Sequence, residues 1–235
     1  MKKKKLFICS CGLRAGQLTP ETARALKLCS VVFSHSLAGG PVASIVRGFC
    51  PDLRPLVNLS PDEIVRAIKA ALKTRPAAAF LTYGNPFFLN EAASLLKREL
   101  ERSGAEVEVL PAVSSFDAIV NMLPLGEFSP AGLRLLHAGL SGGEVEFFPG
   151  MDTLVFMPDK LNRAERPEHA GARKKFLSRA AAAYPAGHPA WLVNAPFMED
   201  LEGRLVRATI GTLGRALRRA DRNTTLYIPA VKTRR

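Results

Sequence analysis

The sequence has no long apolar run, and this absence argues against a membrane-spanning protein. No segment approaches about 18 uninterrupted apolar residues, the length that a transmembrane helix needs. The lysines of residues 2–5 lead directly into a short strand-like segment, without the apolar region and small-residue cleavage site of a secretion signal. We therefore expect a cytoplasmic protein that does not insert into a membrane.

Cysteine is also scarce, and its placement argues against disulfides and against a metal site. Cys9, Cys11, Cys29 and Cys50 all lie in the first fifth of the chain without a repeating framework, which suits reduced thiols in a reducing compartment. Cys9 and Cys11 are too closely spaced for the usual zinc knuckle, and no His cluster accompanies them. A zinc site is the weaker alternative, and we expect no metal.

Acidic residues are few in the last third of the chain. The formal net charge is +12, yet residues 1–159 hold 17 Lys and Arg against 15 Asp and Glu, whereas residues 160–235 hold 16 against 6. A basic face on a second domain could bind nucleic acid or an acidic partner. No aromatic residues alternate with the basic ones, which weakens the case for single-stranded nucleic acid. We favour a solvated, arginine-rich surface.

The chain does have enough apolar residues for a large core, arranged as alternating strands and helices. With 235 residues and 47% hydrophobic content, it can form one large or two small domains. The first half predicts a parallel sheet with helices on both faces, although residues 37–59 show no clear pattern. The expected strands are 6–9, 31–33, 77–82 and 106–110, and the expected helices are 20–27, 61–73, 90–102 and 114–122.

The second half differs in pattern, and we expect a second α/β domain with a mixed sheet. The boundary is expected near residues 124–129, which gives an N-terminal domain of residues 1–125 and a C-terminal domain of residues 126–235. Residues 161–175 are rich in charged residues, Pro and Gly, which predicts an exposed loop or lid. The expected strands lie around 142–149 and at 153–157, 190–193, 203–209 and 224–228, and the expected helices are 176–183 and 211–219.

The most informative segment is Tyr83-Gly84-Asn85-Pro86, where a buried apolar run ends and a helix follows. Gly84 allows the backbone to approach a ligand closely, and Pro86 fixes the direction in which the chain leaves. Parallel sheets bind ligands in the crevice outside the carboxyl ends of their strands. The turn therefore predicts one wall of a ligand pocket, and an ordinary loop without a ligand is the alternative.

Five segments, taken in order, carry a resemblance to one family. They are residues 8–20 with a loop and a Leu-Thr helix start, the turn at 83–86, Leu-Pro-Ala-Val-Ser-Ser at 110–115, residues 153–157 and residues 224–229. In this order and spacing they resemble the tetrapyrrole methylase superfamily of S-adenosylmethionine-dependent methyltransferases, over nearly the whole chain. The resemblance implies two α/β domains with a cofactor cleft between them, S-adenosylmethionine as cofactor, and a homodimer.

Three short segments of the sequence resemble those of one branch of this superfamily, the borosin-type enzymes, which methylate backbone amides of peptides. They are the Gly16-Gln17-Leu18-Thr19 run, the Tyr at position 83 of the turn, and Gly187-His188-Pro189 ahead of a strand. The resemblance implies methylation of a peptide. No substrate segment follows Pro229, so we expect any peptide substrate to be a separate chain.

The resemblance also implies which residues bind the cofactor. Methyl transfer from a sulfonium is an in-line displacement, so the enzyme supplies alignment and a dry cleft and needs no covalent nucleophile. Ser114 and Ser115 would bind through hydroxyl and backbone N–H groups at a helix start, unless they only cap that helix. The full set is Tyr83, Gly84, Asn85, Phe88, Leu89, Ser114, Ser115, Met157, Ala195, Pro196, Thr224 and Thr225.

The chain departs from the peptide-methylating branch at the residues that would handle an amide. An amide nitrogen is a poor nucleophile and needs a base or an oxyanion stabiliser, which that branch provides with an Arg-x-x-x-Tyr motif. Here Arg66 is followed four positions later by Ala70. Tyr83 and His35 are the remaining candidates for catalytic residues. The chain departs from the family at further positions. Cys9 and Cys11 stand where the family has glycines in its opening loop, Asn85 stands where it has an acid or His, and Phe87 stands where the peptide-methylating branch has a small residue.

Three other functions therefore stay open. The substrate could be a small molecule with a more nucleophilic atom, such as a carbon of a tetrapyrrole or corrin precursor. The chain could be a ribosomal RNA ribose methyltransferase, which would be retained on RNA with a steep loss as salt rises. It could also be a non-catalytic homologue that binds S-adenosylmethionine without transferring a methyl group.

Overall fold

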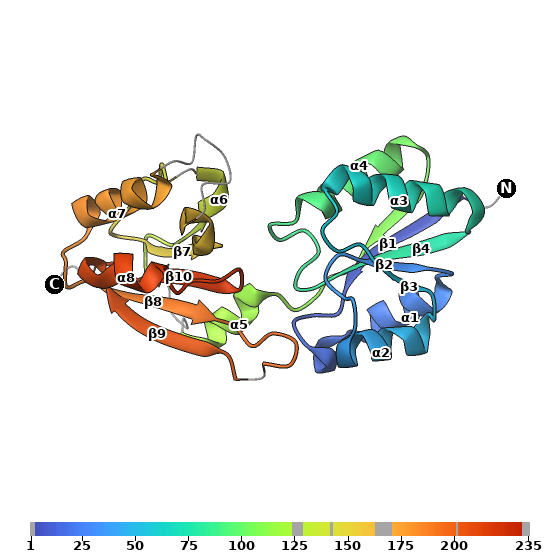
Figure 1. The fold of residues 1–235 in the computed structure, drawn as a ribbon, viewed down its shortest axis with the longest axis horizontal. Helices are drawn as coiled ribbons and strands as arrows, with labels where there is room; N and C mark the ends of the chain where they lie inside the picture. Colours follow the sequence, from blue (N-terminus) through green and yellow to red (C-terminus); the bar gives the residue numbers. More distant parts are fainter. Residues whose placement is uncertain (1–2, 124–128, 142, 163–170, 201, 232–235) are drawn as a thin grey trace. The chain divides into compact units, whose positions relative to one another are not determined.

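The computed structural model describes residues 3–123, 129–141, 143–162, 171–200 and 202–231, and the chain divides into two compact units (Figure 1). The units are Met1–Asp117 and Ala118–Arg235, and each is built on one five-stranded sheet. The predicted fold class of two α/β domains, one with a parallel and one with a mixed sheet, is thus confirmed. The boundary expected between residues 125 and 126 lies outside the described residues.

The sheet of the N-terminal unit is parallel throughout. Its strand order is β3-β2-β4-β1-β5, so β1 lies between β4 and β5. The short apolar runs of β1 and β4 suit strands that helices cover on both faces, and Ile8 pairs with the fully buried Phe80. The strands are β1 (Lys5–Ser10), β2 (Val32–Ser34), β3 (Leu53–Pro55), β4 (Ala77–Thr82) and β5 (Glu106–Val109).

Helices cover both faces of this sheet. Figure 1 shows α1 and α2 on one face and α3 and α4 on the other. Three of the four helices begin at a side-chain cap: Thr19, Ser60 in a capping box with Glu63, and Asn90. The helices are α1 (Pro20–Leu28), α2 (Gly40–Phe49), α3 (Pro61–Thr74) and α4 (Glu91–Arg102), with a short 3-10 helix at Ala15–Gln17.

The C-terminal unit has a mixed sheet of order β6-β7-β10-β8-β9. Only β6 and β7 pair in parallel, and the other neighbours are antiparallel. The strands are β6 (Leu133–His137), β7 (Asp152–Phe156), β8 (Pro189–Asn194), β9 (Arg204–Thr209) and β10 (Thr224–Ile228).

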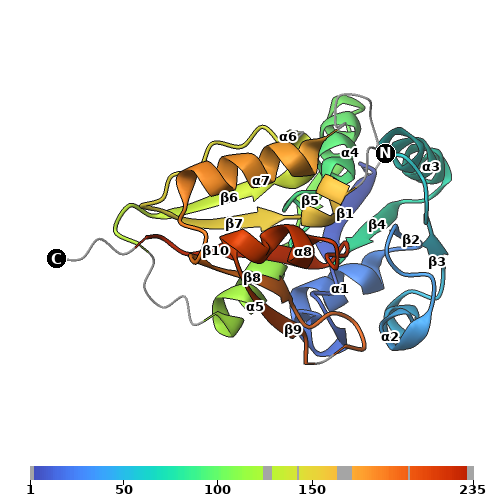
Figure 2. The same ribbon diagram turned by 60° about the vertical axis from the view of Figure 1, so that its left-hand side comes forward.

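Helices α7 and α8 lie over one face of this sheet (Figure 2). The core between these helices and the sheet includes Phe176, Leu213, Leu226 and Ile228, all fully buried. The helical elements are α5 (Ser115–Met122), α6 (Ala138–Ser141), α7 (Ala172–Ala183) and α8 (Leu213–Leu217), with 3-10 helices at Pro158–Asn162 and Ile210–Thr212. In the described part of the chain, no helix has the length and apolar character needed to cross a bilayer.

Two expectations for the second half are wrong. The described residues around 147 form no strand, because Phe147 instead packs edge-on against Phe176 and Tyr184 in the core. The loop expected at 161–175 is helical from Ala172, which is buried one turn before Phe176. Residues 142 and 163–170 of these two segments lie outside the described residues.

Candidate functional site

The carboxyl ends of β1, β4 and β5 bring three loops of the N-terminal unit together. The Gly84 N–H donates to the Gly12 carbonyl at 3.0 Å, which joins the turn after β4 to the loop after β1. A Cβ placed on Gly84 would lie 3.9 Å from Leu13 Cδ2 and 4.0 Å from Ser114 Cα. The structure therefore brings together Gly84 and Ser114, which the sequence placed in one cofactor site.

The turn after β4 presents apolar side chains at this edge. Gly84 has φ +62° and Leu89 has φ +54°, so the backbone turns sharply twice before α4. Tyr83, Phe87 and Leu89 are large and more than a third exposed, and three such side chains in one turn suit contact with an organic ligand. Asn85 shapes the turn, because its Oδ1 accepts from the Phe87 N–H at 3.0 Å. Phe88, also expected here, is half-buried, and its N–H donates to the Asn85 carbonyl.

Ser114 acts as the cap of α5. Its N–H and its hydroxyl both donate to the Asp117 carboxylate, at 2.6 and 2.9 Å. Both groups are thus paired with the first turn of α5, as in half of a capping box, and the cofactor role of Ser114 stays a prediction. Ser115 is the first residue of α5 and is half-buried.

His35 lies beside Tyr83, so the two residues predicted as catalytic are neighbours. The His35 ring stacks on Phe80 at 5.3 Å between centroids and is tilted against Tyr83 at 6.1 Å. Its Nδ1 is buried and has no hydrogen-bond partner among the described residues. Burial lowers the pKa of the imidazole, which keeps the ring neutral and able to accept a proton.

Cys9 and Cys11 pack into the interior at the end of β1. Both are fully buried, and the Cys11 thiol donates to the Thr82 carbonyl at 3.3 Å. Burial raises the pKa of the Cys11 thiol to about 12 and that of Cys9 well above its ordinary value, so both stay neutral thiols at physiological pH. No group of three or more His, Cys, Asp or Glu side chains with a metal-binding arrangement occurs among the residues described.

In the C-terminal unit, the expected cofactor residues gather at one edge of the mixed sheet. Met157 follows β7 with φ +53°, and Ala195 and Pro196 follow β8. Strand β10 runs antiparallel to both, so its first residues, Thr224 and Thr225, lie at the same edge. Their side chains point to opposite faces of the sheet, because successive residues of a strand alternate. A single ligand on one face would thus meet one hydroxyl and not both.

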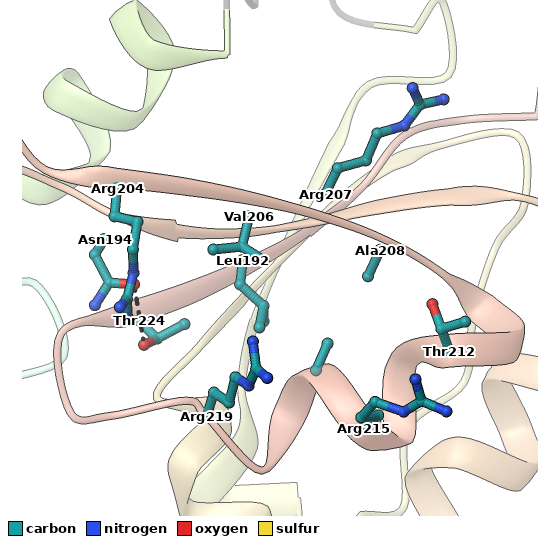
Figure 3. Close-up of a pocket in the computed structure, with 11 residues that line it drawn as sticks. Leu192, Asn194, Arg204, Val206, Arg207, Ala208, Thr212, Arg215, Arg219 and Thr224 are labelled. Atoms are coloured by element: carbon teal, nitrogen blue, oxygen red, sulfur yellow. Dashed lines mark hydrogen bonds between the residues drawn. The ribbon is translucent and has the colours of Figure 1, made fainter.

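Thr224 belongs to a polar cluster that the sequence reading missed. Its hydroxyl donates to Asp221 Oδ1 at 2.9 Å, and Asn194 Nδ2 donates to the same oxygen at 2.9 Å. Next to this cluster is a cavity of about 440 Å³ (Figure 3), lined in part by Arg204, Arg207, Arg215 and Arg219. The excess of basic residues after residue 160 was the one sequence signal for it.

Comparison with protein families gives one match over most of the chain. The model of the family described as Tetrapyrrole (Corrin/Porphyrin) Methylases matches residues 5–214. A search of curated proteins by sequence gives no match.

Solved structures match this chain over nearly its whole length. Uroporphyrin-III C-methyltransferase from Thermus thermophilus has a TM-score of 0.72 at 17% identity, covering 97% of this chain and 93% of that one. The methyltransferase CobJ has a TM-score of 0.69 at 17% identity, covering 99% and 96%. A complex of the Thermus thermophilus enzyme with S-adenosyl homocysteine has a TM-score of 0.71 at 19% identity, covering 96% and 97%. At these identities the likeness is one of fold.

Proposed function

The chain belongs to the tetrapyrrole (corrin/porphyrin) methylase family, and we propose that it transfers a methyl group from S-adenosylmethionine to a carbon of a tetrapyrrole or corrin precursor. The family match confirms the predicted superfamily and, with it, the enzyme class, an S-adenosylmethionine-dependent methyltransferase. S-adenosyl homocysteine, present in one similar structure, is what remains of this donor after methyl transfer, in agreement with the predicted cofactor.

The carboxyl edge of the parallel sheet is the observation that carries the proposal. Gly84 leaves space between the loop after β1 and Ser114, and Tyr83, Phe87 and Leu89 offer exposed apolar surface beside it. These features fit a cofactor with an apolar purine ring and a flexible chain. When bound, S-adenosylmethionine supplies an activated methyl group, and the residues at this edge align it and exclude water.

An acceptor carbon makes fewer demands on the enzyme than an amide nitrogen does. An electron-rich ring carbon is itself nucleophilic, so it can displace the methyl group from the sulfonium directly. The enzyme then needs only to accept the proton that the ring system loses elsewhere, for example from a pyrrole N–H. His35 can serve, because its neutral ring is only partly buried and lies beside Tyr83 at the same edge. We assign this role to His35, with Tyr83 as its neighbour.

Methylation of a peptide backbone, the branch expected from the sequence, has less support. Similar solved structures include a uroporphyrin-III C-methyltransferase and an enzyme of cobalamin biosynthesis, which favours a tetrapyrrole or corrin substrate. Arg66 and Ala70, at the positions of the missing motif, both lie on the exposed side of α3.

We also propose that the chain works as a cytoplasmic homodimer. Leu135 and Leu205 are almost half exposed and lie on the face of the mixed sheet opposite α7 and α8. Exposed apolar side chains of this size suit a contact with a second copy. The four free, buried cysteines suit a reducing compartment.

The substrate is tested with methyl-labelled S-adenosylmethionine and three acceptors: uroporphyrinogen III, an unstructured peptide, and ribosomal RNA. We expect label only in the tetrapyrrole, where mass spectrometry would find one added methylene unit for each transfer. Label in the peptide or in RNA but not in the tetrapyrrole would overturn the proposed substrate. S-adenosylmethionine binding with no label in any acceptor would favour the non-catalytic reading.

A further inference from the structure

The cavity beside α8 has a strongly basic lining. Its volume is about 440 Å³, and the described residues around it include four arginines and no Asp or Glu. Leu192 and Val206 supply an apolar floor. All residues that line the cavity belong to the C-terminal unit.

The other side of the cavity is formed by α8 and the residues next to it. Thr212 immediately precedes the helix, Arg215 lies in it, and Arg219 lies in the turn that follows it. Arg218 follows α8 directly and Arg222 lies in the turn before β10, and neither lines the cavity. Arg215 and Arg219 are therefore called the cavity pair, and Arg218 and Arg222 the outer pair.

The strand side is formed by alternate residues of β9. Arg204 and Val206 face the cavity, opposite Asn194 and Leu192 of β8. Arg207 pairs with Trp191 on the other face of the sheet, and Figure 3 shows its side chain pointing away from α8. Arg204 and Arg219 extend into the space between the strand and the α8 segment (Figure 3).

The charges in the cavity are not neutralised within the described part of the chain. No ion pair or hydrogen bond there involves the guanidinium group of Arg204, Arg215 or Arg219. Asp221, in the neighbouring polar cluster, already accepts through Oδ1 from Asn194, Thr224 and the Asn223 N–H. Asp221 lines a separate, smaller cavity of about 330 Å³, which Arg204 also borders.

Exposed like charges around one cavity repel each other weakly in water, and a bound anion would replace that repulsion with attraction. Guanidinium groups bind carboxylates and phosphates through paired, charge-assisted hydrogen bonds. Groups on opposite walls of one cavity can engage two acidic groups of the same molecule.

We propose that this cavity binds a small organic anion with two or more carboxylate or phosphate groups, held by Arg204, Arg215 and Arg219. Its volume lies within the range of small-molecule sites, and its apolar floor suits the carbon skeleton of such a ligand. An extended polyanion such as RNA is the competing occupant. RNA would spread over the whole basic face and engage the outer pair, Arg218 and Arg222, as strongly as the cavity pair.

The test is calorimetric titration of the full chain at low salt with two probes, inorganic pyrophosphate and citrate. We compare the wild type with the cavity variant R215Q/R219Q and the outer variant R218Q/R222Q. Both variants remove two positive charges within residues 215–222, so the net charge of the protein changes equally. Thermal unfolding of all three proteins checks that each is folded.

We expect the wild type to bind at least one probe, and the probe bound more tightly identifies the phosphate or carboxylate class. The cavity variant should bind it about tenfold or more weakly, while the outer variant stays within about twofold of the wild type. No binding by the wild type would overturn the proposal, as would equal weakening in both variants. Tighter binding of a short RNA that needs both pairs equally would overturn it in favour of RNA.

Discussion

His35 is the residue on which the proposed chemistry depends most. Replacing it with Gln should lower the rate of methyl transfer about 100-fold, because the proton acceptor is lost, and should leave S-adenosylmethionine affinity unchanged. Tyr83→Phe keeps the ring that lies against His35 and tests the hydroxyl separately. A rate unchanged in His35→Gln, measured with saturating cofactor, would remove His35 from the mechanism.

The pH dependence follows from the burial of the same ring. Burial lowers the pKa of His35 below its ordinary value of 6.5, so the wild type should keep its rate of methyl transfer as pH falls to 6.5 and lose it only below that.

The free energy of unfolding should change with pH in the same direction. The unfolded chain takes up a proton near pH 6.5 that folded His35 resists, so stability is full above 6.5 and decreases below it. His35→Gln should flatten this decrease in denaturant unfolding at a series of pH values, with the part due to His137 remaining.

Helix α5 offers a test that separates capping from cofactor binding. Ser114 gives both its N–H and its hydroxyl to Asp117, so Ser114→Ala should lower the free energy of unfolding by about 1 kcal/mol and leave cofactor affinity nearly unchanged. Ser115→Ala, one residue later and within the helix, should not destabilise the protein. A loss of affinity in Ser114→Ala without a loss of stability would restore Ser114 to the cofactor site.

Elements with a clear local signal could be predicted from the sequence, and those without one could not. Strand β4 has a short apolar run, and helix α3 begins with a capping box. The predicted bounds of both elements agree with the structure to within one residue. Helix α2 has Gly39 as its N-cap and therefore no side-chain cap hydrogen bond, and it lies in a stretch that showed no pattern. Phe147 has the apolar character of a strand residue but fills the core from an irregular segment, which only the tertiary packing determines.

At the scale of the whole molecule, the sequence identified the loops of the site better than the roles of their residues. The residues after β1, β4 and β5 meet because parallel neighbours end at the same edge, which topology alone predicts. That Thr224 and Thr225 face opposite sides, and that Arg204, Arg215 and Arg219 share a cavity, depends on strand register and helix placement. Whether the two sets of cofactor residues line one cleft stays a prediction.

Calorimetry with S-adenosylmethionine on the wild type, Gly84→Ala and Gly104→Ala tests the central claim most directly. Both glycines have positive φ and room for a Cβ, so the two changes strain the backbone alike, by about 1 kcal/mol. Only Gly84 lies at the proposed site. The account predicts that the wild type binds S-adenosylmethionine and its demethylated product, that Gly84→Ala binds about tenfold or more weakly, and that Gly104→Ala binds as the wild type does. No heat from the folded wild type with either compound would contradict it.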